Sequence, residues 1–326
     1  MKTHPTFPPS RVDAAARRTP HVAHLPLPRG PRLEFAEQGP PPGPGVTSVL
    51  LLHGITDTWR SFEPVLPHLP ADWHVVSLTQ RGHGGSDATQ PDHRTRDFAA
   101  DAAAFIEVRG MAPAIVVGHS MGAANAMRLA IDRPDLVRGL VAAGAFASFA
   151  DKAALAEFVR TTIVPLGATV PRSLAESFQR DTIAGATAPG LIETMVDECL
   201  RTPAAVWREA FARLFDDDFS ADIGRIAAPT LLPWGRLDAF SPEADQQRIV
   251  REMRARGGTV ERIVYEGAGH ALHWEQPERF ARDLVQFVAG LPPAAADTTR
   301  RVPARAEAAG EAGSVASAAR AALDPV

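Results

Sequence analysis

One stretch decides how this chain folds: Ala114-Ile115-Val116-Val117-Gly118-His119-Ser120-Met121-Gly122. It joins an apolar run to a segment of small, helix-forming residues that starts at Ala123. In a Gly-x-Ser-x-Gly turn between a strand and a helix, the serine holds a strained backbone conformation, and only glycine fits two residues before and after it. Gly118 and Gly122 meet this requirement, so the stretch predicts a sharp turn that presents Ser120 as a nucleophile.

Composition bounds the class of protein. The 326 residues, 45% of them hydrophobic, are enough for one large domain with an insertion, or for two domains. The 34 basic and 38 acidic residues give a formal net charge of -4, which predicts no general attraction to nucleic acid or to an anionic membrane. Cys199 is the single cysteine, so an intramolecular disulfide is excluded, and the sequence has no Cys/His spacing typical of a metal site.

Neither end of the chain has the pattern of a packed domain or of a targeting signal. Residues 1–30 are rich in proline, arginine and histidine, and residues 292–326 are rich in alanine without an apolar stripe, so we expect two disordered tails. Arg17-Arg18 is not followed by the apolar run of an export signal. No run of about 18 apolar residues predicts a membrane span. A cytoplasmic protein is therefore the expectation.

Apolar runs and helical patterns alternate along most of the chain. After a first strand expected at Arg32–Ala36, the predicted strands are Val49–Leu52, Val75–Leu78, Ile115–Val117, Leu136–Ala142, Thr230–Trp234 and Val260–Tyr265. The predicted helices are Phe62–Leu69, Arg96–Arg109, Met121–Arg133, Pro242–Arg256 and Pro277–Ala289. Strands that are apolar on both faces are typical of a parallel sheet covered by helices. The pattern predicts an α/β fold with a mainly parallel sheet.

The alternation stops between residues 145 and 228. Four stretches with helical spacing occupy this interval, and their apolar positions include Leu155, Phe158, Ile192, Val196, Trp207 and Phe211. A helical insertion folded over the carboxyl edge of the sheet would bury these apolar faces. We interpret residues 145–228 as a cap on a core formed by residues 31–144 and 229–291. The same stripes also fit helices that simply belong to the core.

Two later loops supply what a serine nucleophile needs. A serine hydroxyl requires a base within hydrogen-bonding distance and a carboxylate that orients this base. Trp234-Gly235-Arg236-Leu237-Asp238 places an acid just after an apolar strand, and Gly267-Ala268-Gly269-His270 places an imidazole after the next strand. The order Ser120, Asp238, His270 is the one that this type of serine turn predicts.

The chain resembles the serine-type α/β-hydrolases from about Leu33 to Ala289. The resemblance depends on five features in the correct order: His53-Gly54, Gln80-Arg81-Gly82-His83-Gly84-Gly85-Ser86, the serine turn, Gly235-Arg236-Leu237-Asp238, and Gly267-Ala268-Gly269-His270. It implies an α/β-hydrolase fold and a catalytic triad of Ser120, Asp238 and His270. In many relatives the second feature begins with an acid, so Gln80 departs from the family pattern.

Other acids and histidines could fill the same roles. Residues 216–218 form a run of aspartates in the insertion, which we interpret as a solvated loop, and Asp222 belongs to the same polar segment. His53, His83 and His273 lie in or near motif loops and are interpreted as structural. His119, the second residue of the turn, is expected to point away from the site.

An oxyanion formed on a substrate carbonyl requires N–H donors already in place. The N–H of Met121 is one candidate, because it lies at a helix N-terminus, where unpaired donors and the helix dipole favour negative charge. The N–H of Ile55 is the second candidate, because Gly54 lets that loop approach the substrate closely.

These residues predict acyl transfer to water, with a small to medium, apolar ester or lactone as substrate and with no metal or organic cofactor. The predicted pocket residues are apolar side chains near the turn and beneath the cap: Trp59, Phe62, Phe146, Phe240 and Leu272. A carbon–carbon bond hydrolase or a perhydrolase would use the same triad. A receptor-like protein that binds a ligand without turnover is the alternative from another class.

Overall fold

The computed structural model describes residues 19–88, 92–216 and 218–292, which are organised around one eight-stranded sheet. The strands are β1 (His21–Pro26), β2 (Arg32–Gln38), β3 (Ser48–Leu52), β4 (His74–Leu78), β5 (Ala114–His119), β6 (Val137–Ala143), β7 (Thr230–Gly235) and β8 (Val260–Tyr265). Their order is β1-β2-β4-β3-β5-β6-β7-β8. The β1–β2 and β2–β4 pairs are antiparallel, and the other pairs are parallel. The predicted mainly parallel sheet is confirmed.

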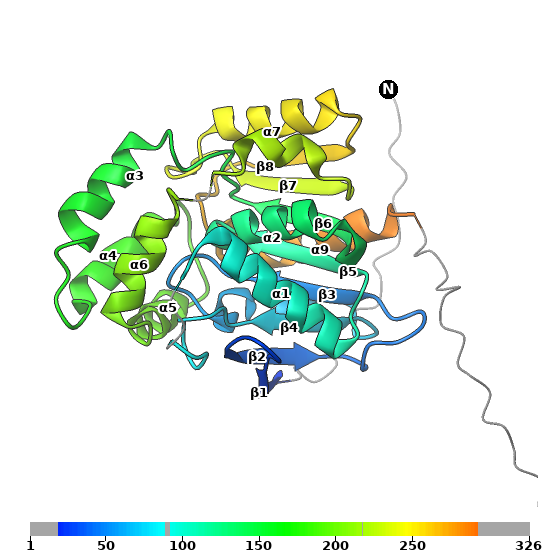
Figure 1. Cartoon of the computed structure of the whole chain (residues 1–326), viewed down its shortest axis with the longest axis horizontal. Coiled ribbons are helices and arrows are strands. Elements are labelled where there is room, and N and C mark those ends of the chain that lie inside the picture. Colours follow the sequence, from blue (N-terminus) through cyan, green and yellow to red (C-terminus); the bar gives the residue numbers. More distant parts are fainter. Residues whose placement is uncertain (1–18, 89–91, 217, 293–326) are drawn as a thin grey trace, which may run out of the picture. The chain divides into compact units, whose positions relative to one another are not determined.

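Helices cover both faces of this sheet (Figure 1). The long helices are α1 (Thr95–Arg109), α2 (Met121–Asp132) and α7 (Glu243–Ala255) on one face and α9 (Pro277–Ala289) on the other, with the short α8 (Leu272–Glu275) just before α9. Alternate side chains of a strand point to opposite faces of the sheet, and helices cover both faces. Every residue of β3 and β5 is therefore buried. Leu50 and Leu52 pack in the cluster that contains α1 and α2, whereas Val49 and Leu51 pack in the cluster that contains α9.

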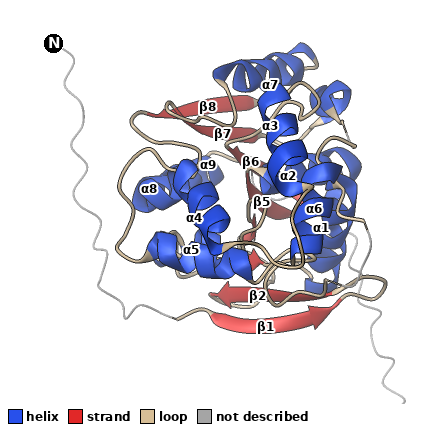
Figure 2. Ribbon diagram, turned by 90° about the vertical axis from the view of Figure 1, so that its left-hand side faces the viewer, coloured by secondary structure: helices blue, strands red, loops and turns tan. Residues whose placement is uncertain are grey.

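The interval between β6 and β7 is helical, as its pattern indicates. It contains α3 (Ala153–Phe158), a π-helical turn (Val159–Ile163), α4 (Arg172–Asp181), α5 (Leu191–Leu200), α6 (Ala204–Arg213) and a 3₁₀ segment (Ser220–Arg225). Figure 1 shows α3 to α6 grouped beyond one end of the sheet, and Figure 2 views the molecule from that side. Their buried apolar residues join the same hydrophobic cluster as α1 and α2.

Two expectations about the first third of the chain are wrong. The range 1–30, expected to be a tail, contains β1, which pairs along its length with β2. This edge strand is mostly exposed, with no fully buried residue, so it has no two-sided apolar run that would reveal it. Residues 62–69 form no α-helix but parts of two 3₁₀ helices, Trp59–Phe62 and Leu66–His68. Prolines at positions 64, 67 and 70 remove the N–H groups that an α-helix would need.

The remaining tail predictions lie outside the described residues, in 1–18 and 293–326. In the described ranges, no helix combines the length and the apolar character that a membrane crossing requires.

Candidate active site

Ser120 occupies the sharp turn between β5 and α2. Its φ of 55° and ψ of -118° are strained for a residue with a side chain. A Cβ on Gly118 would lie 2.1 Å from the Gly122 carbonyl oxygen, and a Cβ on Gly122 would lie 2.1 Å from the Leu52 carbonyl oxygen. Both glycines are therefore required by close backbone contacts, which is the reason predicted from the sequence. The Ser120 N–H donates to the carbonyl of Ala143 at 3.0 Å, which ties the turn to β6.

The loop after β3 lies next to this turn because β3 pairs in parallel with β5, with Leu52 opposite Gly118. Ile55 and Met121 follow these two strand ends and line the same cavity. Among the described residues, the Ile55 N–H has no hydrogen-bond acceptor. Met121 is the first residue of α2, where helical N–H groups lack partners within the helix. Both residues therefore lie at the cavity that Ser120 also lines, each with a backbone N–H that has no partner in its own segment of the described chain.

Asp238 and His270 lie on neighbouring loops, after β7 and β8. The imidazole Nδ1 of His270 is 2.8 Å from Asp238 Oδ2, and both side chains are nearly inaccessible to solvent. The backbone N–H groups of Phe240 and Ser241 donate to Asp238 Oδ1, and the Ser241 hydroxyl donates to Oδ2. Asp238 is thus held in one orientation by four donors.

The same contacts set the charge of the acid. Burial opposes ionisation of Asp238, but the nearby His270 and the donors from Ser241 and Phe240 hold the pKa of this carboxyl below its usual value. Asp238 is therefore ionised at neutral pH and can accept the Nδ1–H of His270. This arrangement leaves Nε2 of His270 as the basic nitrogen.

Ser120 and His270 line one cavity. Among the described residues, no hydrogen bond joins the Ser120 hydroxyl to His270, although every other contact of the predicted triad is formed. Hydrogen bonds of this kind are often loose before substrate binds and tighten in the complex. The fold thus brings the three predicted side chains to one site, where the hydrogen bond between the Ser120 hydroxyl and His270 is the one contact of the predicted triad that is not formed.

The cavity has a volume of about 530 Å³ and is mainly aromatic and aliphatic. Its phenylalanines come from both core and insertion: Phe146, Phe149, Phe158, Phe178, Phe211 and Phe240. Lys152 is the one Lys or Arg among the described lining residues, and its Nζ pairs with Asp151 and Asp245. The cavity therefore offers no unpaired positive charge to an anionic ligand.

Two of the five predicted pocket residues line this cavity, Phe146 and Phe240. Trp59, Phe62 and Leu272 do not. Phe62 and Leu272 are fully buried in the cluster on the α9 side of the sheet, where the ring of Phe62 lies 4.9 Å from that of His273. Trp59 is buried beneath the guanidinium of Arg60. All three side chains are therefore buried away from the cavity.

His119 contacts the site instead of pointing away from it. Its Nε2 lies 3.1 Å from the His270 carbonyl oxygen, and its ring centroid is 4.8 Å from that of His270. Burial, followed by the proximity of His270, lowers the pKa of His119 to about 3, so this imidazole is neutral. His53 braces the adjacent loops, as expected: its Nε2 accepts from the N–H of Gln80, whose side chain donates to the His53 carbonyl.

Asp57 and Gln179 are polar residues of the cavity wall that the sequence did not reveal. Asp57 is 3% exposed and accepts hydrogen bonds from Gln179 Nε2 at 2.9 Å and from the Ser61 hydroxyl at 3.0 Å. Burial is the main cause that raises the pKa of Asp57 to about 7. The only signal for Asp57 was its position three residues after Gly54, in the loop that also carries Ile55.

Known proteins share this architecture. The sequence model of the alpha/beta hydrolase family matches residues 49–283. A pimeloyl acyl-carrier protein methyl ester esterase of Neisseria meningitidis is 30% identical over 76% of this chain and 95% of its own. A 2-hydroxy-6-oxononadienedioate/2-hydroxy-6-oxononatrienedioate hydrolase of Paraburkholderia xenovorans is 26% identical over 76% of this chain and 88% of its own. The solved structure of an esterase from Exiguobacterium antarcticum superposes with a TM-score of 0.72 at 20% identity, covering 82% of this chain and all of that one.

Proposed function

Because the chain belongs to the alpha/beta hydrolase family, we propose that it is a serine hydrolase that cleaves a carboxylic ester or lactone. The observation that carries this proposal is the arrangement of Ser120 on a strained turn in one cavity with His270, whose Nδ1 is held by Asp238. In this proposal residues 145–228 act as the cap over the site.

The proposed reaction has two stages. His270 Nε2 takes the proton of Ser120 as its oxygen attacks the carbonyl, and the N–H groups of Ile55 and Met121 bind the oxyanion. His270 then donates this proton to the leaving oxygen, which yields an acyl-enzyme and an alcohol. His270 then takes a proton from a water molecule as this water attacks the acyl-enzyme, and it returns the proton to the Ser120 oxygen when the acid is released. Asp238 keeps the imidazole in the required tautomer throughout.

The cavity favours an uncharged, apolar acyl compound of small to medium size. Its volume of about 530 Å³ and its phenylalanine walls suit burial of hydrocarbon. The relative named a methyl ester esterase supports ester chemistry for this chain as well.

Carbon–carbon bond hydrolysis is the second candidate, because one relative carries the name of a hydrolase of a dioate. A dianionic substrate needs positive charge in its pocket. Here the one lysine of the described lining, Lys152, is neutralised by Asp151 and Asp245, while Asp57 and Asp181 add acidic groups to the wall. This charge balance favours the ester or lactone over the dianion.

Purified protein should be labelled by a fluorophosphonate probe at Ser120 and should hydrolyse short p-nitrophenyl esters. Ser120→Ala should lose both reactions while keeping its circular dichroism spectrum, because the alanine removes the nucleophile alone. Retained turnover in this variant would contradict the assignment of Ser120. A parallel panel of esters, lactones and vinylogous diketones separates ester from carbon–carbon bond cleavage. Binding without turnover, seen as a shift in melting temperature, would favour a ligand-binding protein.

A further inference from the structure

Three consecutive residues of the loop after β3 are tied to the insertion. Their side chains each form a hydrogen bond with a helix of residues 145–228: Cys199 Sγ to Thr56 Oγ1 at 3.1 Å, Gln179 Nε2 to Asp57 Oδ1 at 2.9 Å, and Thr58 Oγ1 to Glu198 Oε2 at 2.9 Å. Cys199 and Glu198 belong to α5, and Gln179 belongs to α4. This loop starts at Gly54-Ile55, so the contacts immediately follow the proposed oxyanion donor.

The contacts are shielded from water. Thr56 and Thr58 are fully buried, and Asp57 and Gln179 are 3% and 1% exposed. Thr56 also has a φ of 69°, which is unfavourable for a β-branched residue and persists only where its surroundings hold it. A strained, buried loop depends on all its partners, because a donor or acceptor left without a partner in such a place is costly.

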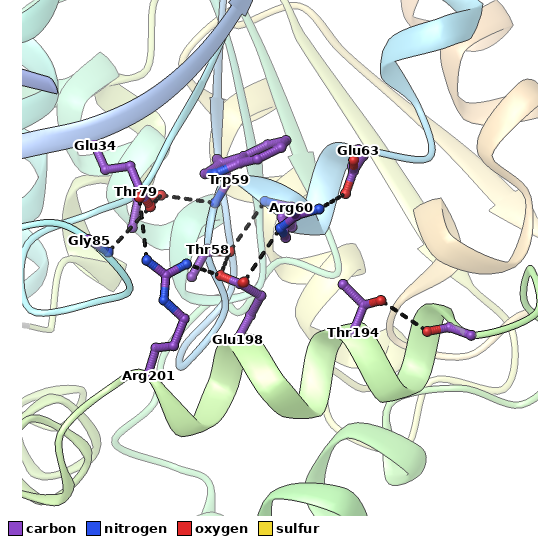
Figure 3. Close-up of polar contacts among 11 residues, drawn as sticks. Glu34, Thr58, Trp59, Arg60, Glu63, Thr79, Gly85, Thr194, Glu198 and Arg201 are labelled. Atoms are coloured by element: carbon purple, nitrogen blue, oxygen red, sulfur yellow. Dashed lines mark hydrogen bonds and ion pairs between the residues drawn. The ribbon is translucent and has the colours of Figure 1, made fainter. Parts of the chain in front are cut away.

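Figure 3 shows the α5 side of this attachment. Glu198 accepts from Thr58 and also lies 3.4 Å from the guanidinium of Arg60 and 2.6 Å from that of Arg201. Arg201 reaches further, to Glu34 of β2 at 3.4 Å. These contacts fix α5 to the core. Among the described residues, Gln179 makes the one hydrogen bond between α4 and residues 54–58, and this contact lies in the cavity wall.

We propose that Gln179 is a positioning residue for the oxyanion hole: through Asp57 it holds the loop that presents the Ile55 N–H. The Ser61 hydroxyl holds the second oxygen of the same carboxyl, so Asp57 is fixed from the core on one side and from the insertion on the other. The insertion is then part of the catalytic geometry as well as a wall of the pocket. This inference rests on the proposed function, since it needs an oxyanion that Ile55 stabilises.

The hydrogen bond can be broken and then rebuilt in reverse. Gln179→Met removes the donor and keeps a side chain of similar length, so the Asp57 carboxyl loses its hydrogen bond to α4. In the double variant Asp57→Asn with Gln179→Glu, the asparagine donates to the glutamate. We expect kcat for a p-nitrophenyl ester at pH 8 to fall about tenfold or more in Gln179→Met, since a displaced oxyanion donor weakens mainly the transition state, while KM changes by less than about threefold. The double variant should recover kcat to within about threefold of the wild type.

Titration of reactive Ser120 with a fluorophosphonate gives kcat per active site, so partial unfolding does not imitate the effect. Arg180→Ala is the matched control, because Arg180 is the next residue of α4, is exposed and pairs with Glu176 of the same helix. It should leave kcat unchanged. The inference is overturned if Gln179→Met keeps wild-type kcat, if only KM rises, or if the double variant stays as slow as Gln179→Met. A wild-type protein with no Ser120-dependent hydrolysis overturns the proposed function together with the inference.

Discussion

The two halves of the candidate site are held in different ways. Asp238 and His270 are fixed inside the core, because every hydrogen-bond donor to the Asp238 carboxylate comes from residues 240–270. The loop at residues 54–58 is held largely by side chains of the insertion, on α4 and α5. We therefore expect the proposed acid–base pair, built within the core, to tolerate changes in the insertion, and we expect the proposed oxyanion loop to be sensitive to them. In this proposal the same helices influence both substrate specificity and rate.

The largest effect should come from the core half. In Asp238→Asn, the amide oxygen can still accept from Phe240 and Ser241, so the turn is kept, but an NH₂ group facing His270 favours the wrong imidazole tautomer. By analogy with triads of this type, kcat should fall by roughly 10⁴-fold. Steady-state kinetics with short and long p-nitrophenyl esters checks this. The loss should be equal for both, since Asp238 does not line the cavity; a loss below about tenfold would remove Asp238 from the proposed triad.

The second prediction concerns Asp57, on the loop half. Burial raises the pKa of Asp57 from 3.8 to about 7, so the folded protein holds this proton more tightly than the unfolded chain. Folding therefore loses stability as pH rises from about 4 to 7, and the full penalty remains above 7. Cys199, which interacts with Asp57, stays a neutral thiol in this window, because burial raises the pKa of this thiol to about 12.

Asp57→Asn removes this penalty while keeping an acceptor for Gln179. Urea unfolding should show the variant more stable than the wild type by up to roughly 4 kcal/mol at pH 8, given about 1.4 kcal/mol for each unit of pKa. The difference should shrink toward zero near pH 4. A difference between the two proteins that does not vary with pH would show that Asp57 has an ordinary pKa. No such gain in stability with rising pH is expected for Asp238→Asn, because the carboxyl of Asp238 has a lowered pKa. The two variants therefore distinguish the loop half of the site from the core half.

The sequence predicted the parts of the molecule that depend on local patterns. Strands β3 and β5 are buried on both faces and appear as continuous apolar runs, and the Ser120 turn is specified by glycines that neighbouring backbone atoms require. The order of the proposed triad follows from the order of the strands. These features need no knowledge of which side chains meet across the fold.

Contacts between distant segments could not be predicted in this way. Gln179 and Asp57 are 122 positions apart, and no periodicity pairs one glutamine with one aspartate. The same limit explains Trp59, Phe62 and Leu272: an aromatic or aliphatic residue near a motif fits a pocket wall and a core equally well until the direction of the loop is known. Phe178 lies in the interval 145–228 that was predicted to be helical, yet its place in the cavity depends on how α4 packs against the rest of the fold.

The smallest predicted effect tests the α5 side of the loop half. Glu198→Ala removes the buried carboxylate that accepts from Thr58 and pairs with both Arg60 and Arg201. The free energy of unfolding should therefore fall by about 1–3 kcal/mol. Glu193→Ala, on the same helix, removes an exposed ion pair with Arg172 and should change it by less than about 0.5 kcal/mol. In both variants the pH dependence of kcat/KM should keep its wild-type midpoint, because the base His270 is held by Asp238 and not by α5. A shifted midpoint in Glu198→Ala alone would show that the insertion also sets the acid–base pair, and the contrast between the two halves would fail.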